Sequence, residues 1–85
     1  MVQKKIIVTR RVEDKARQIV EFVTMVEQFP CEVFFQIQDS IYSGKSIIGM
    51  IAGDCLNQKE IECRCSGEQE EVAMSQIVQW LHPEC

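Results

Sequence analysis

Hydrophobic positions along this chain follow two different periods, which alternate from one segment to the next. Apolar residues recur at every second position in segments 31–38 and 60–66, the pattern of strands with one buried face. Residues 4–9 are rich in β-branched side chains, and residues 41–43 follow a plausible tight turn at Asp39-Ser40. The pattern therefore predicts four strands.

The segments between these strands show helical spacing. A helix is predicted over about residues 15–28 and ends before Pro30, because proline disfavours helical backbone in the residue before it. A short helix is predicted after Ser46, which serves as its N-cap, and Gly53-Asp54 ends it. A last helix is predicted to begin in the acidic stretch 68–71, where negative charge suits the helix dipole, and to end at Pro83. The first helix is expected to bury Ala16, Ile19, Val20, Val23, Val26 and Phe29, and the last Ala73, Met74, Ile77, Val78 and Leu81.

The resulting order is β-α-β-β-α-β-α. Strict alternation in a strand indicates a sheet covered on one face only, and the helices must supply that cover. The sequence therefore predicts an α+β fold, an open-faced β-sandwich. The 85 residues show no linker, repeat or low-complexity tract, so residues 1–85 are expected to form a single domain.

Composition narrows the classes of function. The chain is 46% hydrophobic, 26% charged and carries a formal net charge of −4, which disfavours non-specific nucleic-acid binding. No apolar run is long enough to cross a bilayer, and we expect a cytoplasmic protein without a membrane or cofactor partner. The five cysteines match no common disulfide framework and are expected to be free thiols.

Cysteine and histidine often bind metals or take part in catalysis, but here both residue types are expected to have structural roles. Cys63 and Cys65 share one face of a strand with Ile61, so they are expected to be small buried hydrophobes rather than metal ligands. His82 is the only histidine and is expected to be a solvated residue at the end of the last helix. We therefore predict no metal site.

One short motif connects the chain to a known family. Lys45-Ser46-Ile47-Ile48-Gly49 resembles the regulatory-serine motif K-S-I-M-G of the HPr family of the bacterial phosphotransferase system. The start of the chain and the stretch 60–71 also resemble that family, so the resemblance covers essentially the whole chain. It implies a four-stranded antiparallel sheet with three helices on one face.

The resemblance breaks at the family's active-site loop. The family typically reads G-[LI]-H-A-R-P-A there, whereas residues 13–19 place Lys15 at the histidine position and Gln18 at the proline position. The histidine of the family passes a phosphoryl group from enzyme I to a sugar-specific component. A lysine is protonated at pH 7 and has no lone pair to offer. The chain is therefore not expected to be an enzyme, and is at most a phosphocarrier or a kinase substrate.

Three candidate sites remain, each with a purely structural alternative. The resemblance implies that Ser46 is a regulatory phosphorylation site, although it could be only a helix cap. Ile47, Ile48 and Ile51 either form a docking patch for protein partners or pack against the sheet. Lys15 and Arg17, at the N-terminus of the first long helix, either hold a sulfate or phosphate or are solvated cations.

These sites lead to functions of different classes. The first is a regulatory or interaction protein that acts through Ser46, with a serine kinase, a transcription factor or a phosphotransferase-system component as partner. The family's catabolite-repression branch likewise lacks the histidine and keeps the serine. The alternatives are a phosphocarrier of the sugar phosphotransferase system by descent, and a structural paralogue without phosphate chemistry.

Overall fold

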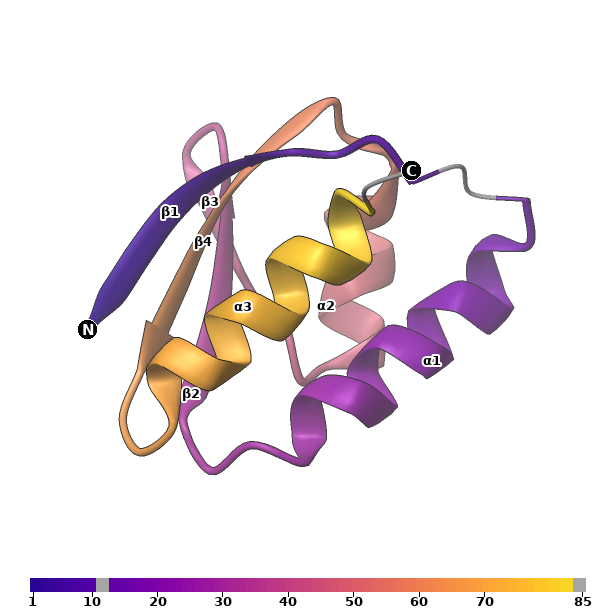
Figure 1. The fold of residues 1–85 in the computed structure, drawn as a ribbon. Helices are drawn as coiled ribbons and strands as arrows, with labels where there is room; N and C mark the ends of the chain where they lie inside the picture. Colours follow the sequence, from indigo (N-terminus) through magenta and orange to yellow (C-terminus); the bar gives the residue numbers. More distant parts are fainter. Residues whose placement is uncertain (11–12, 84–85) are drawn as a thin grey trace.

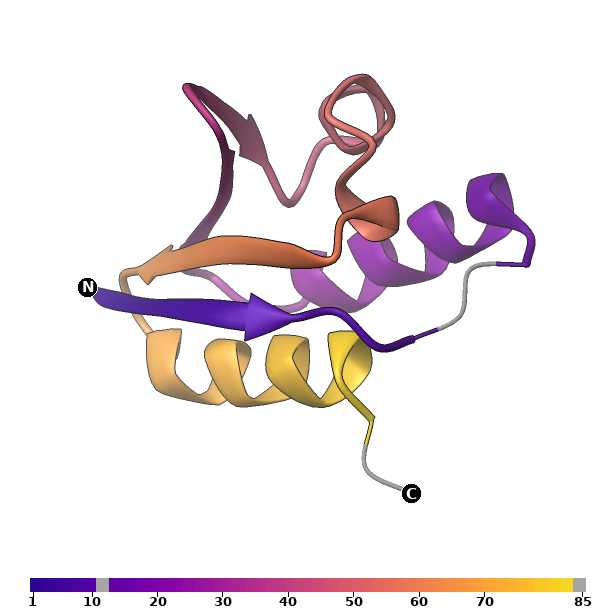
Figure 2. The same ribbon diagram turned by 90° about the horizontal axis from the view of Figure 1, so that it is seen from above.

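Strands and helices follow the predicted order in the computed structural model, which describes residues 1–10 and 13–83. The four strands form one antiparallel sheet in the order β1-β4-β2-β3. Figures 1 and 2 show the helices on one side of this sheet, which confirms the open-faced α+β architecture. The strands are β1 (Val2–Ile7), β2 (Glu32–Ile37), β3 (Ser40–Ser43) and β4 (Glu60–Ser66). The helices are α1 (Lys15–Glu27), α2 (Ile47–Ala52) and α3 (Glu70–Leu81), with a short 3-10 turn, η1 (Cys55–Asn57), after α2.

Strand β4, one of the two inner strands, pairs with β1 on one side and with β2 on the other. Cys63 pairs with Lys4 of β1 on one side and with Phe35 of β2 on the other. Alternate residues of β4 therefore point to the same inner face, and Ile61, Cys63 and Cys65 are all buried there. The prediction that the two cysteines share a buried face with the isoleucine is confirmed.

Phe22 of α1 lies at the centre of the core and is completely buried. Its ring centroid lies 5.6 Å from that of Phe35 and 5.0 Å from that of Trp80, the latter in an edge-on arrangement. This residue thus joins the sheet to both long helices, which run side by side in Figure 1.

The predicted buried face of α1 was wrong at three positions. The face that packs on the sheet is Ile19, Phe22, Val23 and Val26, so Phe22 belongs to it although the prediction omitted it. Val20 lies about 100° around the helix from Ile19 and is 48% exposed. Ala16, in the first turn, is also exposed.

The predicted first strand was placed two residues too late. The observed strand ends at Ile7, after which Val8 N still donates to the carbonyl of Lys59 over 2.9 Å. The N–H groups of Thr9 and Arg10 both donate to the carbonyl of Leu81, at 3.0 and 3.1 Å. The chain therefore turns away from β4 to cap the end of α3, although β-branched residues continue through position 9.

Four cysteines, Cys31, Cys55, Cys63 and Cys65, are free thiols, as predicted. All four are buried, which was predicted only for Cys63 and Cys65. Cys85, the fifth, lies outside the described residues. Burial raises the pKa of Cys55 to about 11, since the thiolate cannot be hydrated there. A hydrogen bond with Cys65, together with burial, also raises the pKa of the Cys63 thiol.

Nothing in the described part of the chain is arranged as a metal site of three or more histidine, cysteine or acidic ligands. Within the same residues, every helix is too short or too polar to cross a membrane.

The buried Cys55 thiol predicts a loss of stability in alkali. Above pH 9.0 the thiol ionises in the unfolded chain, whereas in the folded chain it stays protonated up to a pH of about 11. The unfolded state thus binds fewer protons, and the free energy of unfolding should fall by roughly 2–3 kcal/mol across this window. Urea unfolding measured at several pH values tests this.

The matched control is Cys55→Ala, which removes the titrating group and should flatten part of the pH dependence. Equal slopes for the wild type and this variant would exclude Cys55 as a cause.

Candidate functional site

Ser46 begins α2 and caps it. Its backbone is extended, with φ −110° and ψ 117°, and its Oγ accepts a hydrogen bond from Gly49 N over 3.0 Å. This is the N-cap geometry that the sequence predicts, and it satisfies one N–H that the helix cannot pair internally. The hydroxyl is half-buried and belongs to a helix of six residues.

Lys45 fixes the backbone just before the cap. Its Nζ donates to the carbonyl of Phe29 over 2.6 Å, and its own N–H donates to the Oγ of Ser43 over 3.2 Å. The ammonium thus ties the start of α2 to the chain just after α1. Sequence reasoning gave Lys45 no role beyond the motif.

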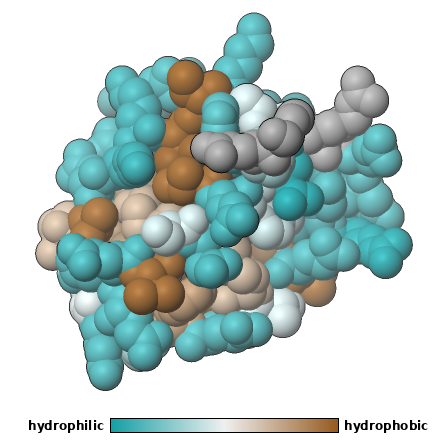
Figure 3. Space-filling view, viewed as in Figure 1, coloured by the Kyte–Doolittle hydropathy of each residue, from teal (hydrophilic) through white to brown (hydrophobic). Residues whose placement is uncertain are grey.

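Helix α2 exposes most of its apolar side chains. Met50 alone among them is fully buried, whereas Ile47, Ile48 and Ile51 are 42%, 81% and 54% exposed. These exposures favour a docking patch over packing against the sheet, and the docking itself stays a prediction. We call these three residues the isoleucine patch. Figure 3 shows hydrophobic residues at the surface among hydrophilic ones on the face that carries α1 and α3.

Lys15 begins α1 and reaches across to the end of α2. Its Nζ forms an ion pair with Oδ1 of Asp54 at 2.6 Å, and both side chains are close to half exposed. Asp54 follows the C-cap residue Gly53, so the pair brings together the start of α1 and the end of α2. Hydrogen bonding to Lys15 is the main cause that holds the pKa of Asp54 below its usual value.

Arg17 also faces carboxylates. Its Nε lies 3.4 Å from Oε1 of Glu21, one turn further along α1, and its backbone N–H donates to Oδ1 of the N-cap residue Asp14 over 3.3 Å. Each predicted anion-binding cation therefore already has an acidic neighbour. A sulfate or phosphate at Lys15 and Arg17 stays a prediction, and it would compete with Asp54 and Glu21.

Asp54 is the residue of this region that sequence reasoning missed as a site residue. The sequence indicates for the Gly53-Asp54 pair only that it ends the helix after Ser46. The partner of Lys15 is 39 positions away in the sequence, since 54 − 15 = 39. No local pattern signals such a contact, which depends on how α1 and α2 pack.

His82 lies at the C-cap of α3 and is exposed, as predicted. Its Nδ1 is 2.9 Å from the carbonyl oxygen of Ile7 and 3.4 Å from Oγ1 of Thr9. These contacts join the end of α3 to the chain after β1, so the imidazole has a structural role there.

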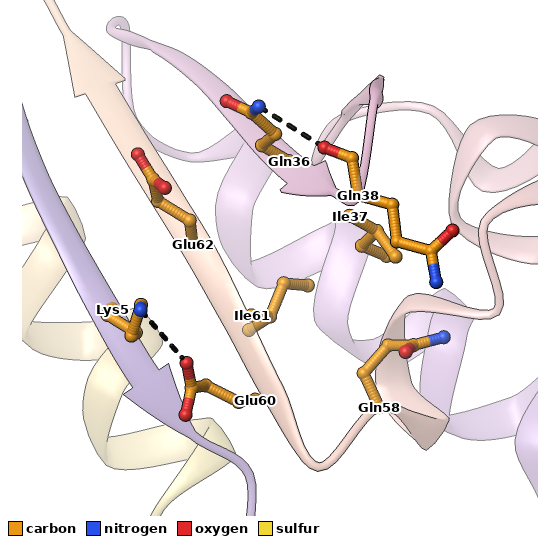
Figure 4. Close-up of a pocket in the computed structure, with 8 residues that line it drawn as sticks. All are labelled: Lys5, Gln36, Ile37, Gln38, Gln58, Glu60, Ile61 and Glu62. Carbon is orange, nitrogen blue, oxygen red and sulfur yellow. Dashed lines mark hydrogen bonds and ion pairs between the residues drawn. The ribbon is translucent and has the colours of Figure 1, made fainter.

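A separate hollow of about 240 Å³ lies where the ladder between β2 and β4 ends (Figure 4). Within it, Lys5 and Glu60 form an ion pair at 3.2 Å, and Nε2 of Gln36 donates to the carbonyl of Gln38 over 3.3 Å. Neither Ser46 nor Lys15 lines this hollow. Its lining residues are Lys5, Gln36, Ile37, Gln38, Gln58, Glu60, Ile61 and Glu62.

Comparison with known proteins places the fold and the site in context. A family model described as the PTS HPr component phosphorylation site matches residues 2–82. No curated protein sequence matches the chain significantly.

Three solved structures illustrate the similarity of fold. The phosphocarrier protein HPr from Bacillus anthracis has a TM-score of 0.83 and 19% identity, over 95% of this chain and 96% of that one. HPr-C-His from Thermoanaerobacter tengcongensis has a TM-score of 0.79 and 16% identity, over 100% of both chains. The catabolite repression protein Crh from Bacillus subtilis has a TM-score of 0.73 and 26% identity, over 95% of this chain and 93% of that one.

Proposed function

Because the chain belongs to the HPr family of phosphotransferase-system proteins, we propose that it is a regulatory or interaction protein of that system. It acts through phosphorylation of Ser46 and docking on the isoleucine patch, rather than through histidine phosphotransfer. The observation that carries this proposal is the juxtaposition of a capping serine with three exposed isoleucines on one short helix.

The region around Lys15 supports the proposal that the protein does not act through histidine phosphotransfer. The only histidine of the chain is engaged at the end of α3, and the residue proposed to stand at the histidine position of the family is a cation paired with Asp54. A protonated amine in an ion pair has no lone pair with which to attack phosphorus. This arrangement supports a function other than histidine phosphotransfer.

The isoleucine patch supports a protein partner. Exposed apolar side chains that adjoin one another are characteristic of interaction sites, since their burial on binding is favourable. Phosphorylation of Ser46 would add about two negative charges beside this patch. The phosphorylated surface would therefore bind a different partner from the unmodified one. One similar structure, Crh from Bacillus subtilis, is described as a catabolite repression protein, which supports a regulatory role. A serine kinase and a transcription factor are the proposed partners.

Two other functions remain alternatives. A phosphocarrier by descent would accept phosphate from enzyme I, whereas a structural paralogue would accept it from no donor. The experiments below separate all three.

Replacement of Ser46 tests the phosphorylation site. Incubation with the serine kinase of the phosphotransferase system and labelled ATP should label the wild type, and Ser46→Ala should abolish the label. Ser75→Ala, on the exposed side of α3, is the matched control and should keep it. Loss of the cap should also lower the free energy of unfolding of Ser46→Ala by about 1 kcal/mol, so its folding is checked by thermal melting. A wild type that takes up no label refutes this role.

Replacement of Ile48, the most exposed member of the patch, tests docking. Ile48→Asp should weaken kinase or transcription-factor binding by roughly tenfold or more, because it introduces a charge into an apolar contact. The melting temperature should hardly change. Ile41→Asp is the matched control, since Ile41 is 56% exposed on β3. Equal affinities of the two variants in calorimetric titrations would show that the patch is not part of the interface.

Incubation with enzyme I and labelled phosphoenolpyruvate tests the absence of histidine phosphotransfer. We expect no phosphohistidine or phospholysine, that is, no label that survives alkali and is lost in acid. Such a label on the wild type would contradict the proposed function and favour the phosphocarrier alternative. A histidine-containing HPr serves as the positive control.

A further inference from the structure

Two adjacent residues, Lys45 and Ser46, lie at the ends of two different helices. Ser46 caps the start of α2 through the hydrogen bond that its Oγ accepts from Gly49 N over 3.0 Å. The side chain of Lys45 extends the other way, and its Nζ donates over 2.6 Å to the carbonyl of Phe29, in the turn that follows α1. The peptide bond between these two residues therefore connects the carboxyl end of α1 to the amino end of α2.

The ammonium of Lys45 suits the carboxyl end of α1 electrostatically. Residues 24–27, the last turn of this helix, include no basic side chain, and Glu27 adds a negative charge where the helix dipole is already negative. The turn beyond is held by the amides of Gln28 and Phe29, which donate to carbonyls of the preceding turn over 3.3 and 3.1 Å. Lys45 thus supplies, from another part of the chain, the positive charge that stabilises this end of α1.

A phosphate on Ser46 would compete with Phe29 for this ammonium. Lys45 and Ser46 are both only partly buried, and the lysine stem is flexible, so Nζ can turn from the carbonyl of Phe29 toward the neighbouring residue. A phosphoryl group carries about two negative charges and three strong acceptor oxygens, whereas the carbonyl is a neutral acceptor. Because an ammonium gains more Coulomb energy from a dianion than from a neutral dipole, the phosphate is the favoured partner.

We propose that phosphorylation of Ser46 draws Lys45 away from Phe29 and thereby loosens the turn that ends α1. The modification is in this way transmitted from the start of α2 to a second helix. This inference rests on the proposed function, since it takes Ser46 as the phosphorylated residue, and it deepens that function by describing how the modification changes the protein that carries it.

Phosphoserine installed by chemical synthesis at position 46 tests this coupling without the kinase. Ligation of synthetic segments gives the full chain with either serine or phosphoserine there, and amide hydrogen exchange is followed by NMR. The phosphorylated protein should exchange the amide hydrogens of Gln28 and Phe29 roughly two- to fivefold faster, the range expected for one charge at a helix end. The amide of Phe35, within the sheet, should exchange at an unchanged rate.

Replacement of Lys45 shows whether the ammonium transmits the effect. In Lys45→Met, the amides of Gln28 and Phe29 should already exchange at the faster rate without phosphate, and phosphorylation should add little. Lys45→Arg keeps a cation and should restore the response to phosphate. Lys59→Met is the matched control, because it removes an exposed lysine before β4 with the same change in net charge and should keep the wild-type response. Thermal melting checks that each variant folds.

A second measurement follows the phosphate itself. Titration by phosphorus NMR should give the phosphoserine a second pKa about 0.5 lower in the wild type than in Lys45→Met, because a neighbouring ammonium favours the dianion. Equal exchange rates of the wild type with serine and with phosphoserine overturn the proposal. An equal response in Lys45→Met, or a phosphoserine pKa that this substitution leaves unchanged, also overturns it. None of these results depends on labelling by the kinase, so failure here is distinguishable from failure of the proposed function.

Discussion

The packing of α1 and α3 on the inner face of the sheet is the interaction on which the rest of this structure depends. The ring of Phe22 contacts those of Phe35 of β2 and Trp80 of α3. Phe22 and Phe35 are fully buried in the core, and the partly buried Trp80 packs against it. Helix α2 adds only Met50 to this core, and its three isoleucines stay exposed at the surface.

Ion pairs form where the start of α1 meets the end of α2. A chain with an excess of acidic residues places a carboxylate on each cation in this region, Asp54 on Lys15 and Glu21 on Arg17. An incoming phosphate has to exchange with a carboxylate instead of entering a vacant cationic site. The same ion pair also links the start of α1 to the turn after α2.

Much of the fold could be predicted from the sequence, because most of its elements follow local rules. Period-2 alternation located β2 and β4, and the Ser46 cap located α2 to the residue. Errors arose where a distant contact overrides the local pattern. Hydrogen bonds to the carbonyl of Leu81, far along the chain, set where β1 ends. The run of β-branched residues does not indicate this end.

The candidate site likewise has a part that local sequence identifies and a part that depends on contacts between distant segments. Ser46 and the isoleucine patch are contiguous in the sequence, and a short motif was enough to identify them as candidates. The Lys15–Asp54 pair joins two distant segments, and the residue pattern contained no signal for it. Exposure of the isoleucines was also undecidable from sequence, since helical spacing in so short a helix fits either a packed or a free face.

The central claim is that partners bind the surface formed by α2 and the start of α1. Amide hydrogen exchange of this protein, measured with and without a saturating amount of the serine kinase, tests it most directly. The account predicts protection concentrated at Ser46, the isoleucine patch and the first turn of α1, with the sheet unchanged. Protection confined to the open face of β1, β4 and β2 would contradict it.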